Sequence, residues 1–140
     1  MENIQLSTGN PSDEYTIRLL IQEANLDDVA IQVHEFLLLK VWDTVIGLGR
    51  IRHHGGILEL CSLAIDENWR NRGLGKKLIA ALTESFSEPV YAVTEIPDYF
   101  AKSGFKITEN YPEVLNDKLQ RCVSCYNCNA PVVMVLRPSK

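Results

Sequence analysis

The sequence has no long hydrophobic run and no leader-like start. No segment of its 140 residues approaches the ~18 consecutive apolar residues that a membrane-spanning helix requires. The first ten residues, MENIQLSTGN, lack the basic start and apolar stretch of a signal peptide. We therefore expect a cytoplasmic protein without a membrane partner, whose thiols stay reduced.

The sequence also has no excess of positive charge. Its 14 Lys and Arg residues against 18 Asp and Glu residues give a net charge of −4. Nucleic-acid-binding proteins usually carry a basic footprint, so no nucleic-acid partner is expected, although a local anion site is not excluded. The length suits a single domain over residues 1–140, and a chain of this size needs no disulfides to hold together.

Cysteine is scarce, and three of the four cysteines lie near the C-terminus. Cys122, Cys125 and Cys128 have the spacing C-x-x-C-x-x-C, which resembles a set of metal ligands. A structural zinc ion requires four ligands, and no second C-x-x-C exists. A fourth ligand would have to be one of Cys61, His34, His53 and His54. We predict no metal site. A zinc clip, thiols near an acceptor pocket, a chance cluster in a loop, and a disulfide formed under oxidation all stay open.

The hydrophobic patterns predict strands alternating irregularly with helices. Strands are expected over residues 3–7, 33–42, 43–52, 57–65, 89–94 and 130–138, and helices over 10–25, 73–86 and 97–105. Asn10 is a good N-cap for the first helix, and His53 to Gly56 are expected to form a turn. Residues 109–131 are expected to form a loop. This order predicts an α+β, mixed-sheet architecture with one core.

The stretch NWRNRGLGKKL, residues 68–78, concentrates positive charge and glycine just before a helical pattern. A helix N-terminus offers unpaired N–H groups, and glycine lets a ligand approach the backbone closely. With its four cations, this stretch predicts a phosphate or pyrophosphate site; a solvated basic helix start is the alternative. It is not a P-loop, because Arg70 stands where the first glycine belongs and Lys77 where Ser or Thr belongs. The dinucleotide fingerprint fails at Leu78.

Another phosphate-binding pattern fits completely. Residues 70–75 read R-x-x-G-x-G and follow LAIDENW on a predicted strand. This stretch resembles the coenzyme A pyrophosphate loop of the GNAT acetyltransferase superfamily, and CSLAIDENWRNRGLGKKLIAAL resembles that family's central strand, loop and helix. YFAKSGF is similar to its later helix. The resemblance covers roughly residues 3–137 and implies a central mixed, mostly antiparallel sheet flanked by helices.

Within the superfamily, the C-terminal half is most similar to small amino-acid acetyltransferases such as the transferase domain of N-acetylglutamate synthases. The stretches AVTEIPDYFAKSGF and YPEVLNDKLQRCVSCYNCNAPVVMVL carry this narrower resemblance.

The resemblance implies direct transfer of an acetyl group from acetyl-CoA, with no metal required. The backbone of Leu63, Ala64 and Ile65 would line the pantetheine arm, and an N–H near Leu63 would hold the developing oxyanion. The pyrophosphate would be held by Arg70, Asn71, Arg72, Gly73, Leu74, Gly75, Lys76 and Lys77.

A base is needed to deprotonate the amine, and Glu59 is the candidate. It lies in an otherwise apolar strand, where alternation places it on the same face as Cys61 and Leu63. The alternative is a glutamate that reaches solvent or pairs with an arginine. Many family members use a tyrosine as acid at the position of Phe100, and Tyr99 precedes it here. Tyr99 is the candidate acid, although on a helix its side chain would point about 100° away from that of residue 100.

The predicted function is transfer of acetyl to a primary amine of a small molecule such as an amino acid. One alternative is a protein or peptide N-acetyltransferase, and another is a non-catalytic acyl-CoA sensor or interaction module. The first helix and residues 27–40 and 109–131 would set acceptor specificity. The sequence names neither the acceptor nor the acyl-chain preference, and a homodimer stays open.

Overall fold

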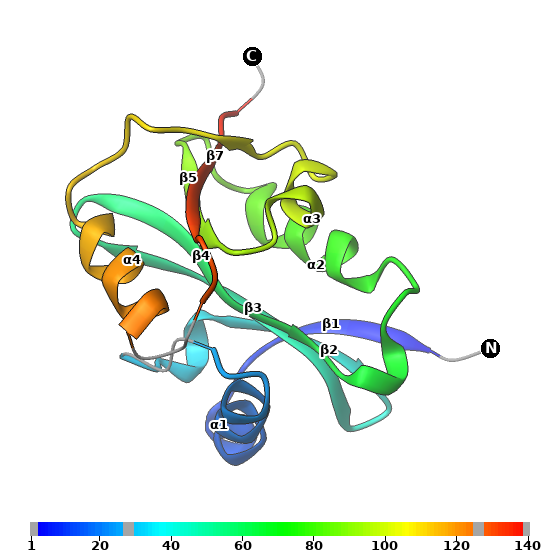
Figure 1. Cartoon of the computed structure of the whole chain (residues 1–140). Coiled ribbons are helices and arrows are strands. Elements are labelled where there is room, and N and C mark those ends of the chain that lie inside the picture. Colours follow the sequence, from blue (N-terminus) through cyan, green and yellow to red (C-terminus); the bar gives the residue numbers. More distant parts are fainter. Residues whose placement is uncertain (1–2, 27–29, 125–127, 139–140) are drawn as a thin grey trace. The chain divides into compact units, whose positions relative to one another are not determined.

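A computed structural model describes residues 3–26, 30–124 and 128–138 of the chain (Figure 1). These residues form two compact units, one made of Met1–Ile51 and Ser62–Glu84 and the other of Arg52–Cys61 and Ser85–Lys140. Strands β3 (Thr44–His54) and β4 (Ile57–Ile65) contribute residues to both units. The seven strands form one sheet in the order β1-β2-β3-β4-β5-β7-β6.

The first unit contains strands β1 (Ile4–Thr8) and β2 (Phe36–Val41), which pair antiparallel, and the adjoining parts of β3 and β4. Helices α1 (Glu14–Glu23) and α2 (Leu74–Thr83) lie on opposite faces of β1, β2 and β3 (Figure 1). One face has a core in which Ile17 and Ile21 of α1 pack with strand residues such as Phe36 and Leu48. Apolar residues recurring at helical spacing therefore bury the predicted face of α1.

The start of α1 confirms the predicted cap. The Asn10 side chain accepts a hydrogen bond from the backbone N–H of Ser12 at 3.0 Å, and the Asp13 carboxylate accepts one from the Asn10 N–H at 3.1 Å. Pro11–Asp13 form a short 3-10 turn, so the α-helix itself begins at Glu14. Reciprocal capping of this kind satisfies N–H groups that the first helical turn leaves unpaired.

The second unit is built around β5 (Val90–Thr94) and β7 (Val132–Leu136), which pair antiparallel. Strand β5 also runs parallel to β4 at Leu58↔Val90 and Glu59↔Tyr91, and the short β6 (Lys106–Ile107) pairs with β7. Helix α3 (Pro97–Ala101) is followed by Gly104 at a φ of 96°, as predicted for its C-terminal glycine. Helix α4 (Leu115–Ser124) packs on β5 and β7.

Two elements differ from the sequence prediction. Residues 115–124 were expected to lie in a loop, but they form α4, whose buried residues are Leu115, Lys118 and Cys122. A lysine at a buried position breaks the apolar periodicity by which the helix would have been found. Strand β6 was not predicted, because two residues carry no periodic signal.

The fold class is confirmed as a mixed, mostly antiparallel sheet flanked by helices. Within the described ranges, every helix is too short or too polar to span a membrane.

The turn between β3 and β4 is shorter than predicted. Strand β3 continues through His53 and His54, and the turn consists of Gly55 and Gly56 at φ values of 56° and 76°. Two successive left-handed residues are typical of a tight hairpin turn, and glycine adopts them without strain. A Cβ on Gly55 would lie 2.9 Å from the Val114 Cγ2, whereas a Cβ on Gly56 would have no neighbour within 4 Å.

The two turn glycines provide a matched test of this packing. We expect Gly56→Ala to lower the free energy of unfolding by about 1 kcal/mol, because only the left-handed backbone is strained. Gly55→Ala should cost about 1 to 3 kcal/mol more, because the new methyl group also overlaps Val114. Urea denaturation measures both values, and equal costs would contradict the close approach of Val114 to the turn.

Candidate active site

A short loop joins β4 to α2 in the first unit. The Asp66 side chain accepts a hydrogen bond from the Asn68 N–H at 2.9 Å and so fixes the start of the turn at Glu67–Trp69. The Arg70 Nε donates to the carbonyl oxygen of Ile65 at 2.9 Å, which ties the loop back to the end of β4. Asn71 follows with a left-handed φ of 64°. These contacts orient residues 70–73, which are all exposed, toward the start of the helix.

The start of α2 has the features of an anion site. Its N-cap is Gly73, at a φ of 75°, which has no side chain to cap the helix. The first intrahelical bond runs from the Lys77 N–H to the Gly73 carbonyl at 3.1 Å, so the preceding N–H groups have no helical partner. The first turn contains no acidic residue. Exposed cations surround it, and they are Arg70, Arg72, Lys76 and Lys77.

The loop and helix therefore combine bare N–H groups, the positive end of a helix dipole and exposed positive charge. The guanidinium of Arg72 stacks on the Trp69 ring at 4.6 Å from its centroid, which limits the positions available to that side chain. Leu74 and Gly75 are buried and anchor the first turn. This arrangement binds phosphate groups in many proteins. It brings together the residues that the sequence predicted for a pyrophosphate.

Strand β4 ends with three half-buried residues, Leu63, Ala64 and Ile65. Just before them, Ser62 has a φ of 58°, which is unusual for a residue in a strand. The left-handed residue interrupts the alternation of the strand. The predicted shared face of Glu59 and Leu63 therefore no longer follows from counting residues.

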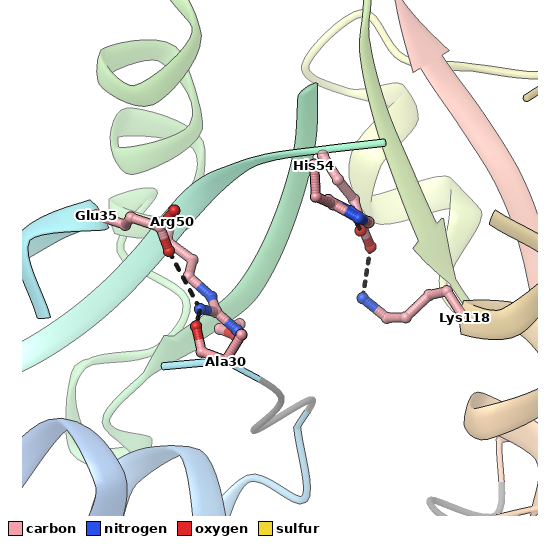
Figure 2. Close-up of polar contacts among 7 residues, drawn as sticks. Ala30, Glu35, Arg50, His54 and Lys118 are labelled. Carbon is pink, nitrogen blue, oxygen red and sulfur yellow. Dashed lines mark hydrogen bonds and ion pairs between the residues drawn. The ribbon is translucent and has the colours of Figure 1, made fainter. Parts of the chain in front are cut away.

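Arg50 of β3 supports this irregular point in the strand. Its side chain is fully buried, and its Nε donates to the Ser62 Oγ at 3.3 Å. Its Nη1 donates to the Ala30 carbonyl at 2.9 Å and to a Glu35 carboxylate oxygen at 3.4 Å (Figure 2). The guanidinium also lies over the Phe36 ring. A buried cation is tolerated when it is paired and hydrogen-bonded, so Arg50 links β2, β3 and β4 of the first unit. Sequence reasoning did not select it.

Glu59 lies at the centre of a charged cluster in the second unit. Its side chain is 1% exposed, and its Oε2 lies 2.5 Å from the Nζ of Lys118 in α4. Its Oε1 lies 2.7 Å from the Nε2 of His54 at the end of β3. His54 and Lys118, both labelled in Figure 2, come from different elements and contact the two oxygens of this carboxylate. The carboxylate pairs with a lysine and a histidine, neither of which was predicted as its partner.

The members of this cluster differ in their access to solvent. The Lys118 side chain is 9% exposed and that of His54 is 23% exposed. A buried carboxylate requires charge compensation and hydrogen bonds, and the two partners supply both. The cluster can hold charge at a fixed point and exchange a proton through its exposed member. The sequence prediction placed His54 in an exposed turn. Its position five residues before Glu59, across a tight hairpin, could have indicated that the two side chains pair.

Tyr99 lies on α3, and its side chain is 37% exposed. Partial burial raises the pKa of the Tyr99 phenol above its ordinary value, so the hydroxyl stays protonated at neutral pH and can donate a hydrogen bond. Its ring contacts the buried Phe100 ring edge to face, with 5.3 Å between the ring centroids. Phe100 in turn packs on Phe105. Phe100 is thus a core residue, and without a hydroxyl it cannot act as the acid.

The cysteines do not form a ligand cluster in the part of the chain that is described. Cys122 and Cys128 form a disulfide, and Cys61 is buried. The disulfide is one of the alternatives left open above, and it contradicts the expectation that the thiols stay reduced. Cys125 lies outside the described residues. Among the described residues, no group of three or more metal-ligating side chains occurs. His34 is exposed in the turn at Val33–Glu35.

Comparison with known proteins gives one family and several similar folds. The profile of the acetyltransferase (GNAT) family matches residues 4–105. No curated protein matches the sequence significantly. The family match confirms both the resemblance stated above and the prediction of an acyltransferase.

Solved structures have the same fold at low sequence identity. The N-acetylglutamate synthase from Neisseria gonorrhoeae, complexed with coenzyme A and N-acetyl-glutamate, matches 100% of this chain with a TM-score of 0.79 and 16% identity. The chain spans 36% of that synthase chain. Rv2747 from Mycobacterium tuberculosis, in complex with CoA, matches 96% of this chain and 99% of its own, with a TM-score of 0.75 and 17% identity. Escherichia coli ElaA matches 98% of this chain and 100% of its own, with a TM-score of 0.68 and 16% identity.

The charged cluster generates a prediction about stability. We expect Lys118→Met to lower the free energy of unfolding by about 3 to 5 kcal/mol, because it leaves a buried carboxylate without its cation. The double variant Glu59→Gln, Lys118→Met should recover most of that loss, because it removes both charges together. Urea denaturation of the two single variants and the double variant gives the coupling energy.

A surface pair provides the control for this cycle. Arg18 and Glu14 form an exposed i,i+4 pair at 2.8 Å, so Arg18→Met should cost no more than about 0.5 kcal/mol. If the stability losses of the two single variants add up to the loss in the double variant, the Glu59 and Lys118 side chains do not interact.

Proposed function

This chain belongs to the acetyltransferase (GNAT) family, and we propose that it transfers an acetyl group from acetyl-CoA to a primary amine of a small molecule. The observation that carries the proposal is the helix start at Gly73, where uncapped N–H groups meet four exposed cations in the family's R-x-x-G-x-G pattern. That combination suits the pyrophosphate of coenzyme A.

The pyrophosphate is held by residues 70–77. The backbone N–H groups at the start of α2 donate to the phosphate oxygens, and Gly73 and Gly75 let the ligand approach them. Arg70, Arg72, Lys76 and Lys77 compensate the negative charge of the pyrophosphate. Asn71 and Leu74 shape the turn from which these groups extend. The contact between Arg70 and the Ile65 carbonyl joins this anion site to the end of β4.

The pantetheine arm extends along Leu63, Ala64 and Ile65. The parallel pairing of β4 with β5 includes Leu58 and Glu59, and further along β4 the backbone of Leu63 to Ile65 pairs with the amides of the arm as with an added strand. The N–H near Leu63 polarises the thioester carbonyl and stabilises the oxyanion that develops on it. The bond from Arg50 to Ser62 supports this function, because it holds the irregular backbone just before Leu63.

The reaction forms a bond from the amine nitrogen to the acetyl carbon and breaks the bond from that carbon to sulfur. The proton of the amine goes to the cluster that contains Glu59, the candidate base. The electron pair of the broken bond goes to the coenzyme A sulfur, which takes a proton from a donor or from water. Tyr99 is the candidate donor, and its raised pKa keeps the phenol protonated until the thiolate forms.

The acceptor is proposed to be an amino acid or a similar small amine. The support is the likeness of the fold to the Neisseria gonorrhoeae synthase, with a TM-score of 0.79 over the whole chain. A protein or peptide acceptor is the second candidate within the same family, and a non-catalytic acyl-CoA sensor is the third. A cytoplasmic location, the absence of a metal requirement and a homodimer stay predictions.

Placing a carboxylate at Gly73 tests the anion site directly. We expect Gly73→Asp to weaken acetyl-CoA binding at least about tenfold, because its negative charge occupies the place of the pyrophosphate at the uncapped N–H groups. Isothermal titration calorimetry measures binding. Incubation with acetyl-CoA and a pool of amino acids, polyamines and short peptides, read by mass spectrometry, measures transfer. The affinity for acetyl-CoA and the amount of acetylated product should fall together.

Gly56→Asp is the matched control. Gly56 has nearly the same left-handed φ, 76° against 75°, and a Cβ at either position would have no neighbour within 4 Å. The two variants change charge and backbone strain alike, but only Gly73 lies at the helix start. Equal acetyl-CoA affinity in both variants would contradict the proposed pyrophosphate site. Tight binding without any acetylated product in the wild type would instead favour the sensor.

A further inference from the structure

We propose that His54 is the catalytic residue that accepts the proton of the attacking amine, and that Glu59 and Lys118 position it. The proposal rests on the acetyl transfer proposed above and deepens it. It assigns the base to a residue of β3 that neither the sequence motifs nor the family match selects.

Burial decides which member of the cluster can meet a substrate. The Glu59 side chain is 1% exposed, and both of its oxygens are occupied, one by Lys118 and one by His54. An amine cannot reach either oxygen without displacing one of these partners. His54 is 23% exposed and is therefore the most accessible member of the cluster from solvent.

The donors and acceptors of the cluster fix the form of the imidazole. A carboxylate only accepts hydrogen bonds, and the Lys118 ammonium only donates them. The short contact of 2.7 Å between Nε2 and Oε1 therefore places the imidazole proton on Nε2. In a neutral ring this leaves Nδ1 with a free lone pair. Within the described part of the chain, the hydrogen bond to Glu59 is the polar contact that His54 makes.

As the nitrogen–carbon bond forms and the carbon–sulfur bond breaks, one proton leaves the amine nitrogen for Nδ1. His54 becomes an imidazolium whose Nε2–H stays bonded to the Glu59 carboxylate. It later returns its proton to water or to the sulfur. A buried carboxylate behind a histidine stabilises the imidazolium and fixes its orientation, as in other catalytic pairs.

Two charged groups of opposite sign face His54. The Glu59 carboxylate of β4 contacts its Nε2, and the Lys118 ammonium of α4 binds the far oxygen of that carboxylate. His53, next along β3, is exposed. Lys118 compensates the charge of Glu59 while the histidine is neutral, so the cluster as a whole gains one positive charge only when the proton arrives.

His54→Gln is the informative variant. The glutamine amide can still donate to the Glu59 carboxylate, but it cannot accept a proton at neutral pH. We expect kcat/KM for acetylation of the amine to fall by about 10²–10⁴-fold, the usual contribution of a general base. The rise of the rate with pH that the imidazole causes should disappear, while the Kd for acetyl-CoA stays unchanged. His53→Gln, the exposed neighbour, should match the wild type in all three measurements.

The outcomes separate this assignment from the proposed function. If the wild type acetylates an amine and His54→Gln has the same rate and pH profile, His54 is not the base, although the enzyme activity stands. If the wild type acetylates no amine in the pool, both statements are wrong. Circular dichroism and urea denaturation establish that the variant is folded.

A second measurement does not require turnover. The ¹⁵N chemical shifts of the His54 ring in labelled protein distinguish a proton on Nε2 from one on Nδ1. We expect the Nε2–H form at neutral pH, and its loss in favour of the Nδ1–H form in Glu59→Gln, whose amide can also donate to the ring. A wild-type ring with its proton on Nδ1 would overturn the assignment.

Discussion

A single buried negative charge determines the polar organisation of the second unit. The Glu59 side chain is 1% exposed, and an isolated carboxylate in such an environment would be strongly destabilising. Its two oxygens are satisfied by Lys118 of α4 and His54 of β3. Helix α4 must therefore present a lysine to the interior. The same contacts leave His54 partly exposed, which links a requirement for stability to the proposed site of proton transfer.

In the first unit, the start of helix α2 leaves several backbone N–H groups without a helical partner. Where many helices use a Ser, Thr or Asp cap, α2 has Gly73 as its N-cap and contains no acid in its first turn. This leaves several N–H groups unsatisfied and costs the helix some stability. The proposed pyrophosphate would offset this cost, because it would accept hydrogen bonds from the N–H groups that the bare helix start leaves exposed. Arg50 has a comparable role at the end of β4, where its buried guanidinium supports Ser62 in an unfavourable conformation.

Much of this fold could be predicted from the sequence where the signal was local. Residues 57–65 form the expected strand, and the R-x-x-G-x-G stretch precedes the expected helix. The prediction failed where an interaction between distant residues decides the structure. Helix α4 was missed because Lys118 looks unsuited to a buried position until its partner Glu59, 59 residues earlier, is known. Arg50 and His54 were missed for the same reason, because neither residue signals its partner.

The structure of the protein with bound acetyl-CoA would test the central claim most directly. Our account predicts pyrophosphate oxygens within about 2.7–3.2 Å of the first-turn N–H groups of α2, a normal hydrogen-bond distance. It also predicts the thioester carbonyl at the N–H near Leu63. A pyrophosphate bound away from residues 70–77 would contradict the assignment of the loop, and with it the reaction derived from that loop.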